Sequence, residues 1–251
     1  MVVDWNNVAL FVLAGFVAQM VDGTLGMAYG VSATAFLLAI GVPPQVASAS
    51  VHAAEVVTTG VSGLSHHTFG NTDRYLIKHL LLPGVVGAAA GAFVLVSSPA
   101  DTVRPLVSAY LLVMGGVIVL KAVRSSVPLN VRSHIAPLGL VGGFLDAAGG
   151  GGWGPIVTTT LIARGNHPRF AIGSVNAVEF FVALSAAVTF ALTIGLSHWP
   201  AIVGLALGGA VAAPLAAWLA RCVPVRPLML LVGGLVMLLS ARTIGQALGW
   251  L

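Results

Sequence analysis

Apolar residues fill the chain in long runs, and two of these runs are broken at related places. The run over residues 6–41 is far longer than the ~20 residues that one membrane-spanning helix needs, and it breaks at Asp22–Gly26. A second run over 135–164 breaks at the glycines of 149–152. Because the pieces beside each break are short for a full crossing, we expect each broken run to be a re-entrant pair of half-helices.

Three further apolar runs follow each broken run. They predict helices over 45–66, 76–97 and 104–123, and then over 169–195, 200–220 and 226–247. The pattern therefore predicts an all-α integral membrane protein with two repeats, residues 1–125 and 126–251, each made of a broken half-helix pair and three transmembrane helices.

The duplication is visible in the sequence itself. Segments Asp22–Glu55 and Asp146–Glu179 align without a gap at an offset of 124 residues, and 13 of their 34 positions are identical. Each copy has a glycine-broken apolar stretch, then a proline, then a helix that carries an acid. Secondary transporters built from two pseudo-symmetric halves, with their site at broken helices near the membrane centre, have this outline.

Composition limits the class of protein. Hydrophobic residues make up 58% of the chain and charged residues 7%, whereas a soluble domain carries about 25% charged residues. We therefore expect a chain surrounded by membrane lipid, whose net charge of +4 bears on topology and not on nucleic acid. The single cysteine, Cys222, offers no disulfide framework and no cysteine metal site. The N-terminus lacks the basic region of a cleavable signal peptide.

Lys and Arg residues predict the orientation of the repeats. If the broken runs are re-entrant, the second repeat is inverted and 9 of the 11 basic residues fall on one side of the membrane. If each broken run crosses once, the repeats are parallel and the split is six to five. The positive-inside rule favours inverted repeats, with only Arg104 and Arg242 on the other side.

Four of the seven acids lie inside apolar segments as two symmetric pairs. These candidates for proton or ion coupling are Asp22, Glu55, Asp146 and Glu179. Burying a carboxylate costs several kcal/mol, so an acid within the membrane is a functional candidate by default. Structural alternatives remain open: the aspartates can cap half-helices, and the glutamates can be protonated and hydrogen-bonded to the broken backbone.

Half-helices that begin inside the membrane predict an anion site, because their first N–H groups are unpaired and carry partial positive charge. The expected substrate-binding residues are Gly23, Thr24, Gly26, Ser50, His52, Gly149, Gly150, Gly151, Ser174 and Asn176. Acids beside an anion are tolerable if apolar surroundings keep them protonated. Release of such a proton would couple movement of the anion to protons.

A stripe of polar residues follows the first break at helical spacing. It comprises Ser48, His52, Glu55, Thr59 and Ser62. The second repeat matches it only with Asn176 and Glu179, so we expect a solvated path along the first helix. The alternative for His52 is a packing role alone.

At these residues the chain resembles the TauE/SafE family of sulfite exporters. The resemblance is carried by the broken segments GFVAQMVDGTLGMAYG and GLVGGFLDAAGGGGWGP and by the A-x-x-S-V-[HN]-A-x-E helices, Ala47–Glu55 and Ala171–Glu179. It implies a multi-pass permease of the bacterial inner membrane that exports sulfite or an organosulfonate, a small anionic substrate. We expect no cofactor, no metal site and no enzymatic activity, and a homodimer is compatible with the sequence.

Two other classes of protein compete with this interpretation. A cation carrier or channel would also use the four intramembrane acids, but the sequence contains no carboxylate or His/Cys cluster with metal-ligand spacing. A membrane enzyme would need a catalytic group at a membrane face. Only His66 and His67 with Asp73 offer one, and we expect these histidines to lie in an interfacial loop.

Overall fold

Helices make up almost all of the structure. The computed structural model describes residues 3–123, 134–219 and 225–248, and these residues contain no strand. The prediction of an all-α protein is therefore confirmed. Five of the described helices are long and apolar enough to cross a membrane: Trp5–Leu25, Arg74–Val96, Ala100–Val123, Pro168–Thr193 and Trp199–Leu219.

The described elements occur in the same order in both halves of the chain. The first half contains η1 (Trp5–Asn7), α1 (Val8–Leu25), α2 (Tyr29–Ala39), α3 (Pro44–Thr68), α4 (Arg74–Val96) and α5 (Ala100–Val123). The second half contains α6 (Ile135–Gly149), η2 (Gly154–Thr158, a π-helix), α7 (Thr159–Ala163), α8 (Pro168–Thr193), α9 (Trp199–Leu219) and α10 (Val225–Ala247). Helices α1 and α2 thus correspond to α6 and η2–α7, and α3, α4 and α5 correspond to α8, α9 and α10.

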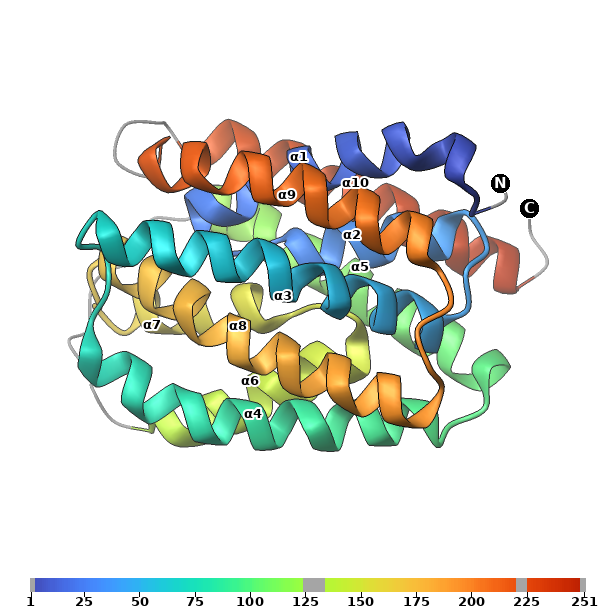
Figure 1. Cartoon of the computed structure of the whole chain (residues 1–251), viewed down its shortest axis with the longest axis horizontal. Helices are drawn as coiled ribbons and strands as arrows, with labels where there is room; N and C mark the ends of the chain where they lie inside the picture. Colours follow the sequence, from blue (N-terminus) through green and yellow to red (C-terminus); the bar gives the residue numbers. More distant parts are fainter. Residues whose placement is uncertain (1–2, 124–133, 220–224, 249–251) are drawn as a thin grey trace.

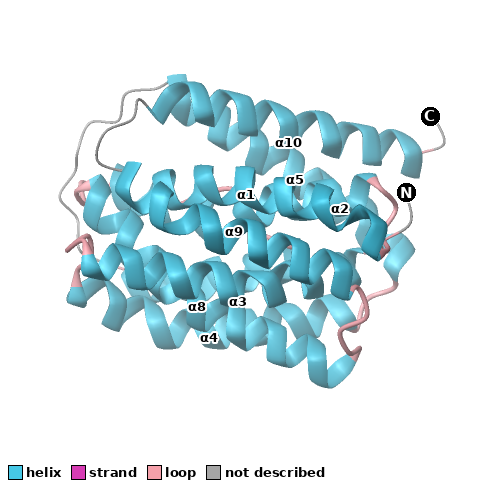
Figure 2. Cartoon of the chain, turned by 45° about the horizontal axis from the view of Figure 1, so that its top comes forward, coloured by secondary structure: helices cyan, strands magenta, loops and turns pink. Residues whose placement is uncertain are grey.

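The two halves interlock instead of packing as separate units. The most extensive contacts join α1 to α9 and α6 to α4, so each broken segment packs on a helix of the other half. Helices α3 and α8 pack against each other in the middle of the bundle, and α5 packs against α10 on its outside (Figures 1 and 2). Neither half could bury its apolar surface without the other.

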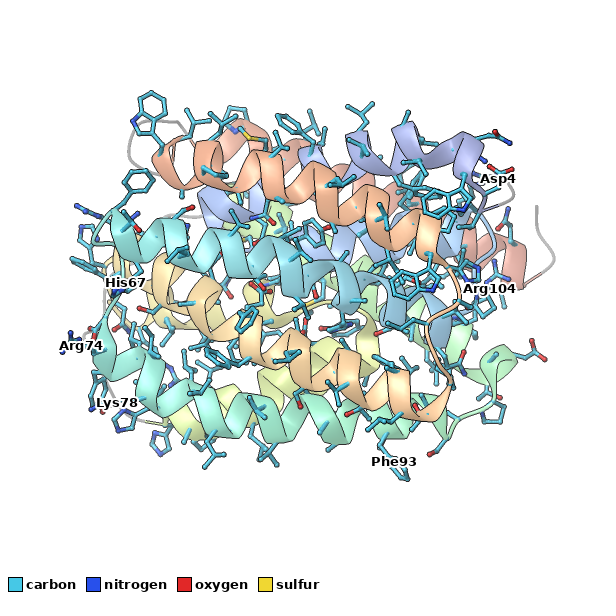
Figure 3. The ribbon with its side chains drawn as sticks, viewed as in Figure 1. Asp4, His67, Arg74, Lys78, Phe93 and Arg104 are labelled. Carbon is cyan, nitrogen blue, oxygen red and sulfur yellow. The ribbon has the colours of Figure 1, made fainter. Side chains whose placement is uncertain are left out.

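Corresponding helices run antiparallel where they touch. A side chain at Gly63 of α3 would meet Ala177 of α8, whereas one at Gly60 would meet Phe180, so the register falls on one helix as it rises on the other. Charged residues lie at both ends of the bundle. His67, Arg74 and Lys78 lie at one end of the bundle, and Asp4 and Arg104 lie at the opposite end (Figure 3).

Small residues allow the helix backbones to approach closely, as in other membrane bundles. A Cβ atom on Gly87 of α4 would collide with the Leu140 carbonyl oxygen of α6 and lie 2.9 Å from the Phe144 nitrogen. The related contact at Gly208 of α9 involves Val12 and Phe16 of α1. The α4–α6 and α1–α9 contacts therefore depend on glycine.

Replacement of Gly87 by Ala is expected to lower the melting temperature of the purified protein in detergent, because overpacking typically costs about 1–3 kcal/mol. Gly116→Ala is the matched control, since a Cβ atom there meets nothing within 4 Å. Equal melting temperatures for the two variants would contradict the tight α4–α6 contact.

Three sequence-based expectations need correction. Helix α1 continues past Asp22 to Leu25, so with η1 it forms a segment of 21 residues, longer than the short piece that the sequence predicted. The break therefore begins at Gly26, which has φ +67°, and Asp22 lies in the last turn of α1. Helix α5 begins at Ala100 and not at the predicted residue 104, which places Pro105 inside the helix. Of the basic residues in the charge count, Arg124, Arg132, Arg221 and the side chain of Arg226 lie outside the described residues.

Candidate functional site

The two chain breaks meet at the centre of the bundle, backbone against backbone. A Cβ atom on Gly30 would lie 2.8 Å from the Gly151 Cα atom, and one on Gly154 would lie 2.5 Å from the Met27 Cα atom. These contacts are related by the duplication, because Gly30 corresponds to Gly154 and Met27 to Gly151. Non-helical backbone at membrane depth is tolerated only where it is buried in protein or lines a cavity. Here the two breaks bury each other.

Asp22 and Asp146 hold the two breaks in the same way. Each lies near the end of the helix before its break, and each carboxyl group accepts a hydrogen bond from the N–H seven residues later. Asp146 Oδ1 is 2.9 Å from the Trp153 nitrogen, and Asp22 Oδ1 is 3.4 Å from the Tyr29 nitrogen. Both side chains are buried. The capping alternative therefore agrees with the geometry, although each aspartate caps the next segment from the preceding helix.

His52 connects the two repeats through Asp146. Its Nδ1 is 2.8 Å from the Ser48 carbonyl oxygen, which can only accept, so Nδ1 carries a proton. Its Nε2 is 3.2 Å from Asp146 Oδ2. Either a neutral imidazole accepts from a protonated carboxyl, or an imidazolium donates to a carboxylate. In both cases one proton is shared across the boundary between α3 and α6.

Glu55 and Glu179 each have a buried carboxyl oxygen without a hydrogen-bond partner, the Oε2 atom in both residues. Glu55 is 1% exposed and Glu179 is 4% exposed, so solvent does not compensate for the missing partners. The four acids are close enough for charges on Asp22, Glu55 and Asp146 to interact with a charge on Glu179. Such a group cannot carry four negative charges in apolar surroundings, so it must hold protons or cations.

Other predicted site residues lie near the breaks without joining this group. Gly150 contributes a carbonyl oxygen that accepts from the Thr34 hydroxyl group, and Gly26 packs against the related Thr158. Gly23 packs against Ala216, and Gly149 packs against the ring of Tyr110. Asn176, which corresponds to His52, bonds to Ser62 and to the Ile172 carbonyl oxygen.

Three predicted substrate ligands form hydrogen bonds within the protein. Thr24 bonds to the Met20 carbonyl oxygen, and Ser50 bonds to the Val46 carbonyl oxygen, both within their own helices. Ser174 accepts from the Asp73 N–H at the start of α4, 2.7 Å away. Serine and threonine in helices commonly bond to the preceding turn, as Thr24 and Ser50 do. A residue that is identical in both repeats, such as Ser50, can therefore have a structural role, a ligand-binding role or both.

Sequence reasoning missed three contributors. Thr34 and Thr158 are identical in the two copies, which was the available sign of a shared role. Tyr110 of α5 lies against both Gly149 and Gly152, and nothing in its local sequence indicates this.

The polar stripe on α3 is buried, not solvated, in this conformation. All five of its side chains are at most 1% exposed. Ser48 bonds to the Ala147 carbonyl oxygen of α6, and Ser62 bonds to Asn176 of α8. The stripe faces the second repeat because α3 packs against α8 and α9.

His66 and His67 do not form a loop pair, because both lie in the last turn of α3. His66 is buried, with its Nε2 3.0 Å from the Gly23 carbonyl oxygen. His67 is exposed and contacts Thr72. The two side chains point to different surroundings, which removes the geometric basis for a catalytic cluster there.

One cluster in the described part of the chain has the composition of a metal site. Ligand atoms of His52, Glu55 and Asp146 all lie within 4.8 Å of one another. Spacing along the sequence could not reveal this cluster, because Asp146 is 94 residues from His52 along the chain and reaches it only through the packing of the repeats.

A bundle of apolar helices with two broken segments and four buried acids at its centre defines a membrane transporter. The profile of the sulfite exporter TauE/SafE family matches residues 11–243, and the chain belongs to this family. It is 44% identical over 250 residues to the probable membrane transporter protein YtnM of Bacillus subtilis (strain 168), covering 95% of this chain and 83% of YtnM. No solved structure matches the chain.

Proposed function

We propose that the protein exports sulfite or an organosulfonate across the bacterial inner membrane by alternating access. The observation that carries this proposal is the meeting of two half-helix starts at the centre, where the N–H groups of Tyr29 and Trp153 donate to the carboxyl groups of Asp22 and Asp146 instead of to their own helices. Helix starts of this kind attract small anions, and the family's name supplies sulfite as the first substrate to test.

We also propose that the halves are inverted repeats, with the end that carries Arg74 and Lys78 in the cytoplasm. The antiparallel contacts of α3 with α8 and the clustering of basic residues at one end support this orientation. It provides the two opposite access states that a carrier needs, because inverted halves can exchange their conformations around the central breaks.

Cysteine labelling tests the inversion. In a Cys222→Ser background, Thr68→Cys lies at the end of α3 and Ser197→Cys lies in the loop after α8; both positions are exposed. Inverted repeats predict that a membrane-impermeant reagent applied outside the cell labels Ser197→Cys and spares Thr68→Cys until the membrane is permeabilised. Labelling of both from the same side would exclude inversion.

Coupling to protons is the further part of the proposal. Glu55 and Glu179 both have an unpartnered Oε2, and we propose Glu179 as the proton carrier, because its repeat has Asn176 in the place of His52. The charged groups that face it are Asp22 on α1, Glu55 on α3 and Asp146 on α6. A proton on Glu179 would relieve repulsion among these acids, and its loss would reverse that effect.

The substrate is tested by flux in proteoliposomes that contain the purified protein. Radiolabelled sulfite should accumulate above the level in protein-free liposomes, and unlabelled organosulfonates should compete if they share the site. No sulfite flux and no competition would overturn the proposed substrate class.

A cation carrier is the second candidate, favoured by the His52–Glu55–Asp146 cluster. It predicts flux of the cation itself into proteoliposomes without any anion. Flux of Na⁺ or a divalent metal in the absence of sulfite would favour it, and flux of sulfite without such cation movement would exclude it.

A further inference from the structure

We propose that His52, Glu55 and Asp146 bind one divalent first-row transition-metal ion at the boundary of the two repeats. The first two residues come from α3 and the third from α6. Their ligand atoms converge within 4.8 Å although the residues lie in different halves of the chain. The interior position, the mixed donor set and an unpaired ligand atom together distinguish this cluster from a group of surface acids.

Two of the three distances between ligand atoms are close to those of a metal site, and the cluster would contract when an ion binds. Ligand atoms around a tetrahedral ion with bonds of about 2.0–2.1 Å lie about 3.3 Å apart. His52 Nε2 is 3.2 Å from Asp146 Oδ2 and 3.9 Å from Glu55 Oε2. Glu55 Oε2 has no hydrogen-bond partner and the residue is 1% exposed, so this oxygen is available as a metal ligand.

Neighbouring groups orient the ligands. The Ser48 carbonyl oxygen holds the proton of His52 on Nδ1, which turns Nε2 toward the cluster. The Trp153 N–H, 2.9 Å from Asp146 Oδ1, fixes the aspartate and leaves Oδ2 for the metal. Metal-binding histidines and carboxylates are usually held by outer hydrogen bonds of this kind.

Only one of the two pseudo-symmetric positions has this donor set. Asn176 occupies the place of His52 in the second repeat, and its side chain is bonded to Ser62 and to Ile172. We therefore expect one ion per chain. One imidazole nitrogen with two carboxylate oxygens favours Zn²⁺, Co²⁺ or Mn²⁺ over Mg²⁺ and Ca²⁺, which prefer oxygen ligands alone.

A bound ion would change the charge at the centre of the membrane. Two carboxylates and a divalent cation are together neutral, which removes the cost of two buried negative charges. Three protein ligands also leave a coordination position for an oxygen of an anionic substrate. That last role rests on the proposed export of an oxyanion, whereas binding of the metal does not.

The test uses the purified full-length protein in detergent after treatment with a chelator. Titration with Co²⁺, followed by its visible absorption, and with Zn²⁺, followed by calorimetry, should show one ion per chain. His52→Gln and Glu55→Gln should each weaken binding by at least about tenfold, since even loss of an outer-shell partner has an effect of 10–100-fold. Mg²⁺ should not compete. Absence of bound Co²⁺ and Zn²⁺ in the wild-type protein would overturn the proposal.

Controls separate this cluster from surface histidines and from misfolding. The double variant His67→Gln/His79→Gln removes two histidines at the end of the bundle and should bind like wild type; loss of binding there, with binding retained in His52→Gln, would overturn the assignment. Zn²⁺ should raise the melting temperature of wild type and of Glu55→Asp, which keeps a carboxylate, but not of Glu55→Gln. Equal shifts in all three proteins would also overturn it.

Transport measured on the same preparations keeps the two proposals distinct. Metal binding that follows the expected pattern in a protein without sulfite flux would support the metal site and overturn the proposed substrate. Sulfite flux in a wild-type protein that binds no metal would support the proposed substrate and overturn the metal site.

Discussion

Replacement of Gly154 by Ala is expected to abolish sulfite flux and to lower the yield of folded protein. A Cβ atom at this position would collide with the Gly26 carbonyl oxygen and lie 2.5 Å from the Met27 Cα atom. Both obstacles are backbone atoms of the other half, so no side chain can rotate to make room. Overpacking in a rigid interior costs about 1–3 kcal/mol or more, and here it would also separate the two breaks.

Gly234→Ala is the matched control for this prediction. Gly234 is an exposed helical glycine of α10, and a Cβ atom there meets nothing within 4 Å. The measurements are the monodisperse yield, the melting temperature in detergent and sulfite flux in proteoliposomes. Wild-type stability and flux in Gly154→Ala would show that the breaks tolerate separation and that their contact does not form the site.

A substitution in the first break should disrupt the contact between the two breaks as well. Gly30→Ala would place a Cβ atom 2.8 Å from the Gly151 Cα atom and 2.9 Å from Glu55 Oε1. Because Gly30 and Gly154 are related by the duplication, similar losses in the two variants are expected if the centre works as a pseudo-symmetric unit. A large loss in only one would show that one half alone carries the substrate.

The sequence predicted the broken segments because their signal is local. Glycines interrupt an apolar run, an acid precedes each interruption, and a proline begins the next helix. Because the same pattern occurs twice, the two broken segments could be assigned more firmly than from one copy alone. The exact ends were less predictable: Asp22 looked like the start of a half-helix, but helix α1 continues through it and stops only where Gly26 adopts a left-handed conformation.

The contacts between the halves could not be predicted in the same way. The contact between His52 and Asp146 spans 94 residues and depends on α3 packing beside α6. Without an arrangement of the helices, spacing along the chain suggested that no metal cluster existed. The contact of Ser174 with the Asp73 N–H at the start of α4 could not be predicted either, because it also joins the two halves of the chain.

The duplication also conceals a difference that matters chemically. The two repeats share Asp22 with Asp146 and Glu55 with Glu179, yet His52 is replaced by Asn176. In the structure the histidine lies beside the acids of the boundary, whereas the asparagine bonds to Ser62. We therefore expect the two halves to differ in their affinities for protons and cations.

Glu179→Gln is expected to remove the dependence of sulfite flux on a pH gradient. Glutamine keeps the shape and hydrogen-bonding capacity of a protonated glutamate but cannot release a proton. Gradient-driven accumulation should therefore fall by at least about tenfold, toward the level without a gradient, because loss of a positioned proton-transfer group commonly costs 10²–10⁴-fold in rate. Exchange of labelled for unlabelled sulfite, which needs no net proton movement, should continue.

Asp101→Asn provides the control, because it removes the same charge at the exposed start of α5. It should keep both gradient-driven accumulation and exchange. If Glu179→Gln also keeps both, the proton is carried elsewhere and the unpaired Oε2 of Glu179 is only structural. If it loses exchange as well as accumulation, the residue is needed for substrate movement itself, and proton coupling through Glu179 is excluded. Only loss of accumulation with retained exchange agrees with a proton carrier. In that case the substrate still moves through the protein, but the pH gradient no longer drives its movement.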